Sequence, residues 1–243
     1  MQHDRRSQTA ANSDPVGLEE RFRAFVRARD FPCVGAKSAL ARGSIRTLVA
    51  REMTSAWDDL RIYAALLDFA AAYRAEPGPF QSLAVIFEGE PPRSEQAFEQ
   101  ALWERVQSLS DKDGWLGQPY DPRVSEDADD PHFSLSFGGE AFFIVGLHPK
   151  ASRPARRFEA PVLVFNPHDQ FEQLRADGRY EGLRESIIGR DVAMAGSPNP
   201  MLSRFGETSE ARQYSGRAVG SDWKCPFHAK PRAAPKGFGD EPD

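Results

Sequence analysis

The sequence lacks the features that would assign it at once to a broad class of protein. It has two cysteines, Cys33 and Cys225, in 243 residues, too few for a disulfide-stabilised scaffold. No apolar run approaches the roughly 18 residues that a membrane-spanning helix needs. The first thirteen residues are polar and contain no apolar segment, so we expect no secretory signal, a cytoplasmic location and no membrane partner.

Several common enzyme and binding motifs are also missing. The formal net charge of −5 gives no electrostatic basis for binding nucleic acid. There is no Gly-x-Gly-x-x-Gly and no phosphate-binding loop, so we expect no nicotinamide-binding unit within the chain. There is no Gly-x-Ser-x-Gly turn to support a serine hydrolase. With 28% charged and 40% hydrophobic residues, the composition is that of a globular protein.

The hydrophobic pattern predicts an α+β fold with a mixed, partly antiparallel sheet flanked by helices. Four strands are expected, over residues 82–87, 133–137, 141–147 and 161–165. Gly138-Gly139 suits a two-residue turn, because both of its positions need positive φ, and it predicts a hairpin over 133–147. We expect one domain over 14–228, a disordered tail over 1–13 and a flexible tail over 229–243.

Helices are expected on either side of these strands. One begins at Asp14-Pro15 and ends before Pro32, and another covers about 55–73 with Trp57, Leu60, Ala64 and Leu67 on its apolar face. Further helices are expected around 98–109, after Asn166-Pro167 and around 180–187. Residues 110–131 are rich in Asp, Gly and Pro and predict a long surface loop, and a lid is one role open to it.

A histidine stands where a buried strand ends. The apolar run 141–145 leads into Gly146-Leu147-His148, and Pro149 stops the strand by removing a backbone donor. Arg153, Arg156 and Arg157 follow. One imidazole beside several arginines suits a large anionic cofactor that is ligated through its metal, such as haem with its two propionates. The alternative is a capped strand end followed by a solvated basic loop.

The two cysteines and two glutamates give less specific signals. Cys33 is expected to be a small buried hydrophobe rather than a nucleophile. Cys225-Pro226-Phe227-His228 is consistent with half of a zinc site, with a thiolate ligand for haem iron, or with a packed terminal plug. Glu207 and Glu210 share a face if they are helical, where they would suit a guanidinium or ammonium substrate; otherwise they are two solvated acids.

Five segments together resemble the YqcI/YcgG family, over about residues 20–228. They are Phe31-Pro32-Cys33-Val34-Gly35-Ala36-Lys37-Ser38-Ala39, Gly146-Leu147-His148-Pro149-Lys150-Ala151-Ser152-Arg153, Asn199-Pro200-Met201, Arg212-Gln213-Tyr214-Ser215-Gly216 and Trp223-Lys224-Cys225-Pro226-Phe227-His228. Characterised members include haem-dependent N-hydroxylases of guanidino groups in the guanitoxin and D-cycloserine pathways. The resemblance therefore implies a b-type haem protein that activates O₂ or peroxide.

From this resemblance we expect a monooxygenase that hydroxylates a nitrogen of an arginine-like guanidino or amine substrate. His148 is expected to ligate the iron, with Cys225 as the alternative ligand. The residues expected to contact the cofactor are Ser152, Arg153, Arg156, Arg212 and Tyr214. Those expected near the substrate are Asn199, Glu207 and Glu210.

No side chain is assigned a catalytic step of its own, because the iron carries out the oxidation. Electrons are expected from a separate donor or from peroxide, and the sequence leaves a homodimer open. Two alternatives remain at this stage. One is a haem sensor or carrier without turnover, and the other is a zinc hydrolase built on Cys225 and His228.

Overall fold

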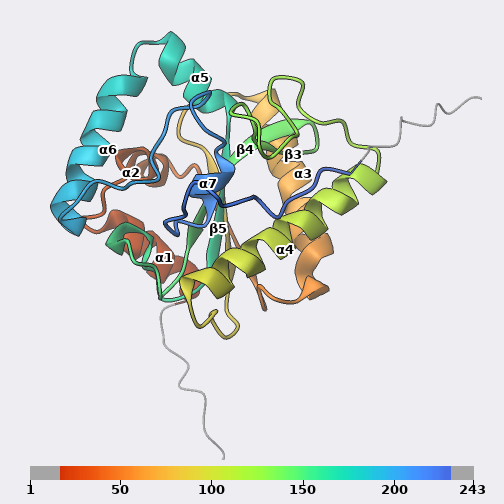
Figure 1. The fold of residues 1–243 in the computed structure, drawn as a ribbon, viewed down its shortest axis with the longest axis horizontal. Helices are drawn as coiled ribbons and strands as arrows, with labels where there is room; N and C mark the ends of the chain where they lie inside the picture. The colour runs from red at the N-terminus through yellow and green to blue at the C-terminus, as the bar shows by residue number, and fades with distance from the viewer. Residues whose placement is uncertain (1–16, 231–243) are drawn as a thin grey trace, which may run out of the picture.

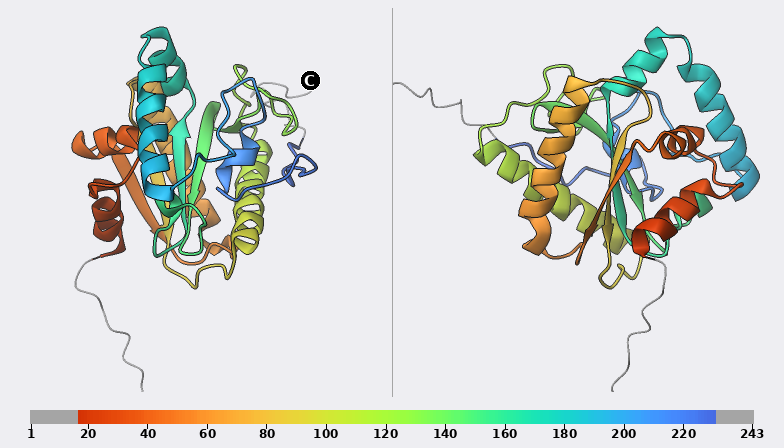
Figure 2. Two further views of the ribbon diagram at one scale, coloured as in Figure 1. Left: turned by 60° about the vertical axis from the view of Figure 1, so that its left-hand side comes forward. Right: turned by 180° about the vertical axis from the view of Figure 1, so that it is seen from behind.

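A five-stranded sheet lies between two layers of helices, as the computed structural model of the chain shows for residues 17–230 (Figures 1 and 2). The strands are β1 (Ile45–Ala50), β2 (Ser82–Phe87), β3 (Leu135–Phe137), β4 (Glu140–Leu147) and β5 (Val162–Pro167). The α-helices are α1 (Leu18–Arg27), α2 (Val34–Ala41), α3 (Asp59–Ala75), α4 (Glu95–Trp115), α5 (Asp169–Ala176), α6 (Tyr180–Ala195) and α7 (Ala211–Tyr214). Two short 3₁₀ turns, Ala56–Asp58 and Pro154–Arg156, complete the described elements.

The strand order is β1-β2-β5-β4-β3. β1 and β2 are parallel, and each of the other neighbouring pairs is antiparallel. The predicted α+β class and mixed sheet are therefore confirmed. The predicted hairpin is also confirmed: β3 pairs with β4 across Gly138 and Gly139, whose φ values are +59° and +78°.

The sheet separates two hydrophobic cores because successive side chains of a strand point to opposite faces. In β2, Leu83, Val85 and Phe87 join the core under α3 and α4. Ala84 and Ile86 join the second core, under α1, α2 and α5. Figure 2 shows the resulting arrangement, with α1, α2 and α6 on one side of the sheet and α4 on the other. The two faces can therefore hold different sites.

Two α-helices, α2 and α7, and one strand, β1, were not predicted from the sequence. β1 forms the parallel edge strand beside β2. β1 is short and carries polar residues at Arg46 and Thr47, so its apolar signal is weak. Its place is fixed by pairing with β2, a long-range contact that local sequence does not encode.

Two predicted boundaries and one predicted helix face are wrong. α4 continues to Trp115, so the first residues of the predicted 110–131 loop are helical. In the helix predicted over 55–73, a 3₁₀ turn precedes α3, and Trp57 and Leu60 are 73% and 72% exposed. α3 is apolar on more than one face, and it buries the face that carries its bulkier side chains, Ile62, Tyr63, Leu66, Phe69 and Tyr73.

The predicted tail 1–13 and the helix start at Asp14-Pro15 lie outside the described residues, and so does most of the predicted tail 229–243. α1 begins after Gly17, which occupies its N-cap position. At the other end of the described chain, Ala229 packs on the core and Lys230 pairs with Asp111 near the end of α4.

The close approach of α4 to the end of β4 gives a test of the packing. A Cβ at Gly146 would lie 2.7 Å from the Phe98 ring and 3.0 Å from the carbonyl oxygen of Tyr214. Because this site is closely packed, we expect Gly146→Ala to lower the free energy of unfolding by about 1–3 kcal/mol, measured by urea denaturation. Gly182→Ala, where an added Cβ meets nothing within 4 Å on helix α6, is the control and should be neutral or stabilising. An equal effect of both substitutions would contradict the packing described.

Candidate functional site

The second core contains a cavity of about 290 Å³ between the sheet and helices α1, α2, α5 and α6. This volume is near the lower limit for small-molecule sites. Its walls are largely apolar, and they include Phe22, Val26, Phe80, Val145, Leu147, Leu183 and Ile187. An apolar cavity of this size, interrupted by few polar groups, is the default place to look for a ligand in a protein of unknown function.

One group of polar side chains in the cavity is already satisfied by its neighbours. The hydroxyl of Ser82 donates to Oδ1 of Asn166 at 2.7 Å. Asn166 donates in turn to the carbonyl oxygens of Phe143 and Val164. Gln170 exchanges two hydrogen bonds with the backbone of Gln81. These side chains fix the β2–β5 edge of the cavity and have few remaining groups to offer a ligand.

A second polar group in the wall contains Cys33, Arg156, Asp191 and Asn199. Arg156 donates to three backbone carbonyl oxygens, those of Gly146, Gln213 and Tyr214, at 3.0–3.1 Å. Burial lowers the pKa of Arg156 to about 10, and the nearby carboxylate of Asp191 partly offsets this effect. Arg156 therefore joins the end of β4 to α7 and presents a positive charge at the cavity wall.

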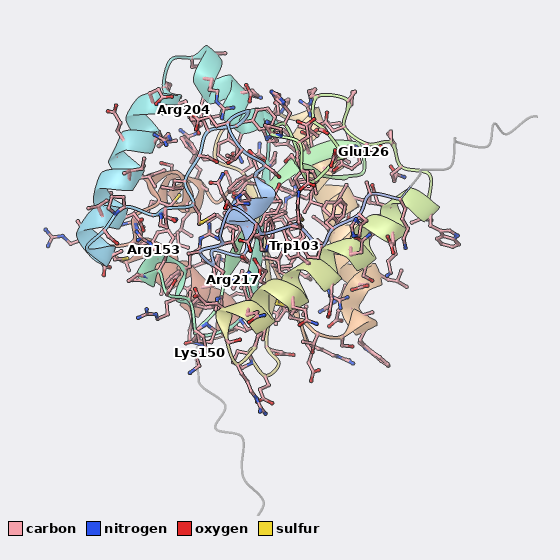
Figure 3. All side chains as sticks on the ribbon, viewed as in Figure 1. Trp103, Glu126, Lys150, Arg153, Arg204 and Arg217 are labelled. Atoms are coloured by element: carbon pink, nitrogen blue, oxygen red, sulfur yellow. The ribbon has the colours of Figure 1, made fainter. Side chains whose placement is uncertain are left out.

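Arg153 lies beside this group, next to the C-terminal part of α6 (Figure 3). It forms an ion pair with Asp191 and donates to the carbonyl oxygen of Ser197 at 3.0 Å. Ser152, its neighbour, is exposed, and its backbone N–H donates to Glu95 at the start of α4. Of the residues expected to contact a cofactor, Arg156 alone lines the cavity. Arg153 lies outside the lining and pairs with the wall residue Asp191.

Cys33 is a wall residue that the sequence analysis expected to be inert. It occupies the N-cap position of α2, and its Sγ accepts a hydrogen bond from the backbone N–H of Ala36 at 3.4 Å. Burial raises the pKa of this thiol, while its backbone hydrogen bonds and Arg156 oppose the rise. The sequence predicted neither the helix that follows Cys33 nor the position of this residue against a cavity.

His148 lies on the other face of the sheet. Its ring stacks on Phe98 of α4, with 4.2 Å between ring centroids and 19° between planes. The side chain is 1% exposed, and Nδ1 accepts a hydrogen bond from the backbone N–H of Lys150 at 3.3 Å. Leu147, the preceding residue, lines the cavity instead. The imidazole and the cavity are thus separated by the sheet.

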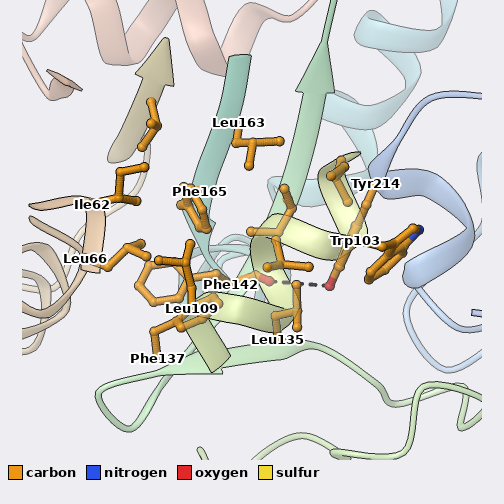
Figure 4. Close-up of a cluster of buried hydrophobic side chains, with 14 of the residues drawn as sticks. Ile62, Leu66, Trp103, Leu109, Leu135, Phe137, Phe142, Leu163, Phe165 and Tyr214 are labelled. Atoms are coloured by element: carbon orange, nitrogen blue, oxygen red, sulfur yellow. Dashed lines mark hydrogen bonds between the residues drawn. The ribbon is translucent and has the colours of Figure 1, made fainter. Parts of the chain in front are cut away.

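Tyr214 and Arg212 belong to the same face as His148. Tyr214 is fully buried, stacks on Trp103, and donates its hydroxyl to the carbonyl oxygen of Phe142 at 3.4 Å (Figure 4). Arg212 lies over the ring of Trp223 and donates to the carbonyl oxygen of Gly220. Tyr214 therefore packs on α4, Arg212 binds the C-terminal segment, and neither residue lines the cavity.

The three residues expected near a substrate are dispersed. Asn199 lines the cavity, and its Oδ1 accepts from the backbone N–H of Met201 at 3.0 Å. Glu207 is exposed and pairs with Arg204. Glu210 is buried beside His168, with 3.7 Å between Oε1 and Nδ1, and does not line the cavity. The two glutamates therefore do not form a common cation site with Asn199.

The Cys225–His228 segment packs against α4. Phe227 is 2% exposed and contacts the rings of Trp103 and Phe133. Burial raises the pKa of Cys225 to about 12. His228 is exposed, and its backbone N–H donates to Gln107. Of the three interpretations of this segment, its contacts are those of a packed terminal plug. Within residues 17–230, no group of three or more His, Cys, Asp or Glu is placed to hold a metal ion.

Comparison with known proteins agrees with the resemblance seen in the sequence. The YqcI/YcgG family model matches residues 22–228. The chain belongs to the YqcI/YcgG family. No curated protein and no solved structure matches it. None of the helices in the described part of the chain is long and apolar enough to cross a membrane.

Four of the five segments that suggested the YqcI/YcgG family either line the cavity or contact Arg156. Three of them contribute cavity residues, namely Cys33, Leu147 and Asn199. The 212–216 segment supplies two of the carbonyl groups that Arg156 binds. Gly216, with φ of +84°, lets the chain pass close to that guanidinium, since a Cβ there would lie 3.3 Å from Nη1. Segments far apart in the sequence thus line one cavity or contact the arginine in its wall.

The haem expected of this family member can be compared with these residues. A porphyrin needs apolar walls, a partner for its carboxylates, and an axial donor for iron. The cavity supplies the first two through its hydrophobic lining and Arg156, and Cys33 is the thiol in its wall. His148 does not fit as a ligand to a group in this cavity, because it lies across the sheet. A complete macrocycle is also larger than the cavity and requires its helices to move apart.

The environment of His148 predicts its protonation state. Burial lowers its pKa to about 4 from an ordinary value of 6.5. The unfolded chain takes up a proton below about pH 6.5 while the folded imidazole stays neutral, so stability is full above that pH and falls as the pH drops toward 4. We expect the His148 ring to remain neutral at pH 5 in NMR titrations. Titration near pH 6.5 would contradict the buried, stacked position.

Proposed function

We propose that the protein is a haem-dependent monooxygenase that hydroxylates a nitrogen atom of an amine or guanidino compound. The observation that supports this most directly is the apolar cavity with Cys33 and Arg156 in its wall. Oxygen activation needs a site that excludes water and holds the reacting group in place. A hydrophobic cavity bounded by helices on one side and a sheet on the other offers those conditions.

The side chains of the cavity have separate tasks in this proposal. Cys33 is the candidate donor to iron, and a thiolate ligand in haem enzymes favours O–O cleavage. Arg156 pairs with a carboxylate through the donors that its backbone contacts leave free. Apolar residues such as Phe22 and Leu147 exclude water, and Asn199 contributes an amide for orientation.

The reaction also requires an external source of electrons. One oxygen atom of O₂ enters the N–O bond and the other leaves as water, with two electrons and two protons taken up; with peroxide, no added electrons are needed. No motif for a flavin or nicotinamide is present in the sequence. We therefore propose a separate reductase or peroxide as the partner.

The proposal is tested first by absorption spectra of protein purified after expression with added haem precursor. We expect a Soret band in the wild type, and a shifted or lost band in Cys33→Ser. Cys225→Ser, which changes the other buried cysteine outside the cavity, is the matched control and should keep the wild-type spectrum. If His148→Ala loses the band while Cys33→Ser keeps it, the cofactor site lies on the other face of the sheet and the cavity assignment is wrong.

Turnover is tested separately with the haem-loaded protein. Guanidino compounds and amines are supplied with oxygen and a chemical reductant, or with peroxide, and products are followed by mass spectrometry. We expect a product heavier by one oxygen atom, with the oxygen on nitrogen. A haem spectrum that responds to these compounds without any oxygenated product would favour the alternative of a haem sensor or carrier.

A further inference from the structure

The charges beside the cavity do not balance. Arg153 and Arg156 both lie near Asp191, the carboxylate in the cavity wall, and Arg190 precedes Asp191 on α6. That carboxylate is already paired with Arg153. Among the described residues, no Asp or Glu oxygen lies within 4.0 Å of the guanidinium groups of Arg156 or Arg190, which donate to backbone carbonyl groups instead. This end of the cavity therefore carries an excess of positive charge.

Unused hydrogen-bond donors lie in the same region. The Nε–H groups of Arg153 and Arg190 are buried and have no acceptor among residues 17–230. A buried donor without an acceptor is destabilising, and more so when the group is charged. Because Arg153 and Arg190 do not line the cavity, the group that an acceptor inside it would meet is the guanidinium of Arg156.

The rest of the cavity limits the kind of molecule that can carry such an acceptor. Its walls are formed by aromatic and aliphatic side chains from α1, β4 and α6, and the polar side chains of Ser82, Asn166 and Gln170 are satisfied by each other or by the backbone. A strongly polar body would lose its hydration there without compensation. A guanidinium or ammonium would also meet like charges at the arginine end.

We propose that this cavity binds a carboxylic acid with an apolar body, its carboxylate held by Arg156 and its body against the hydrophobic walls. The inference rests on the proposed function only in that the same cavity is the ligand site. The carboxylate belongs either to the cofactor or to a free small acid. In the second case, the ligand enters with its acid end toward Arg156 and its far end toward the β2–β5 edge.

The test compares ligands that differ only in their polar end. Octanoate, octanol and octylamine are titrated by calorimetry into wild-type protein without haem. A charge-assisted hydrogen bond to Arg156 should make octanoate bind about tenfold or more tightly than octanol, with octylamine weakest. Protoporphyrin IX and its dimethyl ester, followed by absorbance, form the second arm and report the same preference for a cofactor carboxylate.

Each outcome decides the inference. A preference for octanoate assigns the site to a free acid, and a preference for the porphyrin diacid alone assigns it to the cofactor; both support the proposal. If octanol or octylamine binds as tightly as octanoate, and the porphyrin ester binds as tightly as the acid, the inference is wrong. Because the fatty ligands are tested without haem, failure of the haem experiments leaves this result standing, and the reverse also holds.

Variants add a check that is specific to one side chain. In Arg156→Met the ratio of octanol to octanoate dissociation constants should fall to about one. Arg157→Met changes an exposed neighbour that donates to the backbone of Ala151 and Ser152 and does not line the cavity, so the ratio should stay at the wild-type value. If Arg156→Met does not fold, Arg156→Lys, which keeps the charge, should retain the preference, and the wild-type series still decides the matter.

Discussion

The structure depends on one half-buried guanidinium, that of Arg156, and on the three carbonyl groups that it binds. Those carbonyls belong to the end of β4 and to α7, two parts of the chain that local hydrogen bonds do not connect. Backbone carbonyls solvate a cation without neutralising it, so the charge persists beneath the surface. The lowered pKa of Arg156 expresses the resulting desolvation cost. The binding of an anion beside this unneutralised charge would therefore stabilise the folded protein.

The sheet determines which residues can act together. Neighbours in a strand project to opposite faces, so Leu147 enters the cavity while His148 enters the packing under α4. From the sequence, His148 and the arginines that follow it were expected to bind the same ligand. After the strand ends, however, the chain turns back, and the backbone N–H of His148 donates to the carbonyl oxygen of Arg156. The two residues are therefore linked through their backbones. The His148 ring stacks on Phe98 of α4, whereas Arg156 lines the cavity and also binds carbonyl oxygens of α7, on the same face as His148.

The elements predicted correctly from the sequence are those with a local hydrophobic or turn pattern. β2, the β3–β4 hairpin and most of α4 follow from continuous apolar runs, paired glycines and helical periodicity. β1 and α2 were missed because their signals are weak and their stability comes from long-range packing. The exposure of Trp57 shows the same limit, since a periodic apolar stripe does not say which face a helix buries. Cys33 entered the site through the position of α2, which only the folded chain reveals.

The chemistry open to the cavity follows from the scarcity of polar groups inside it. A guanidinium carries a charge that is costly to remove from water unless a carboxylate receives it. The carboxylate in the wall, Asp191, is paired with Arg153, and Glu210 lies outside the cavity. A nitrogen oxidised in this chamber is therefore better presented as a neutral amine, whose lone pair is free to react and whose desolvation costs less. The positive charge of Arg156 works in the same direction, because it lowers the proton affinity of a nearby amine.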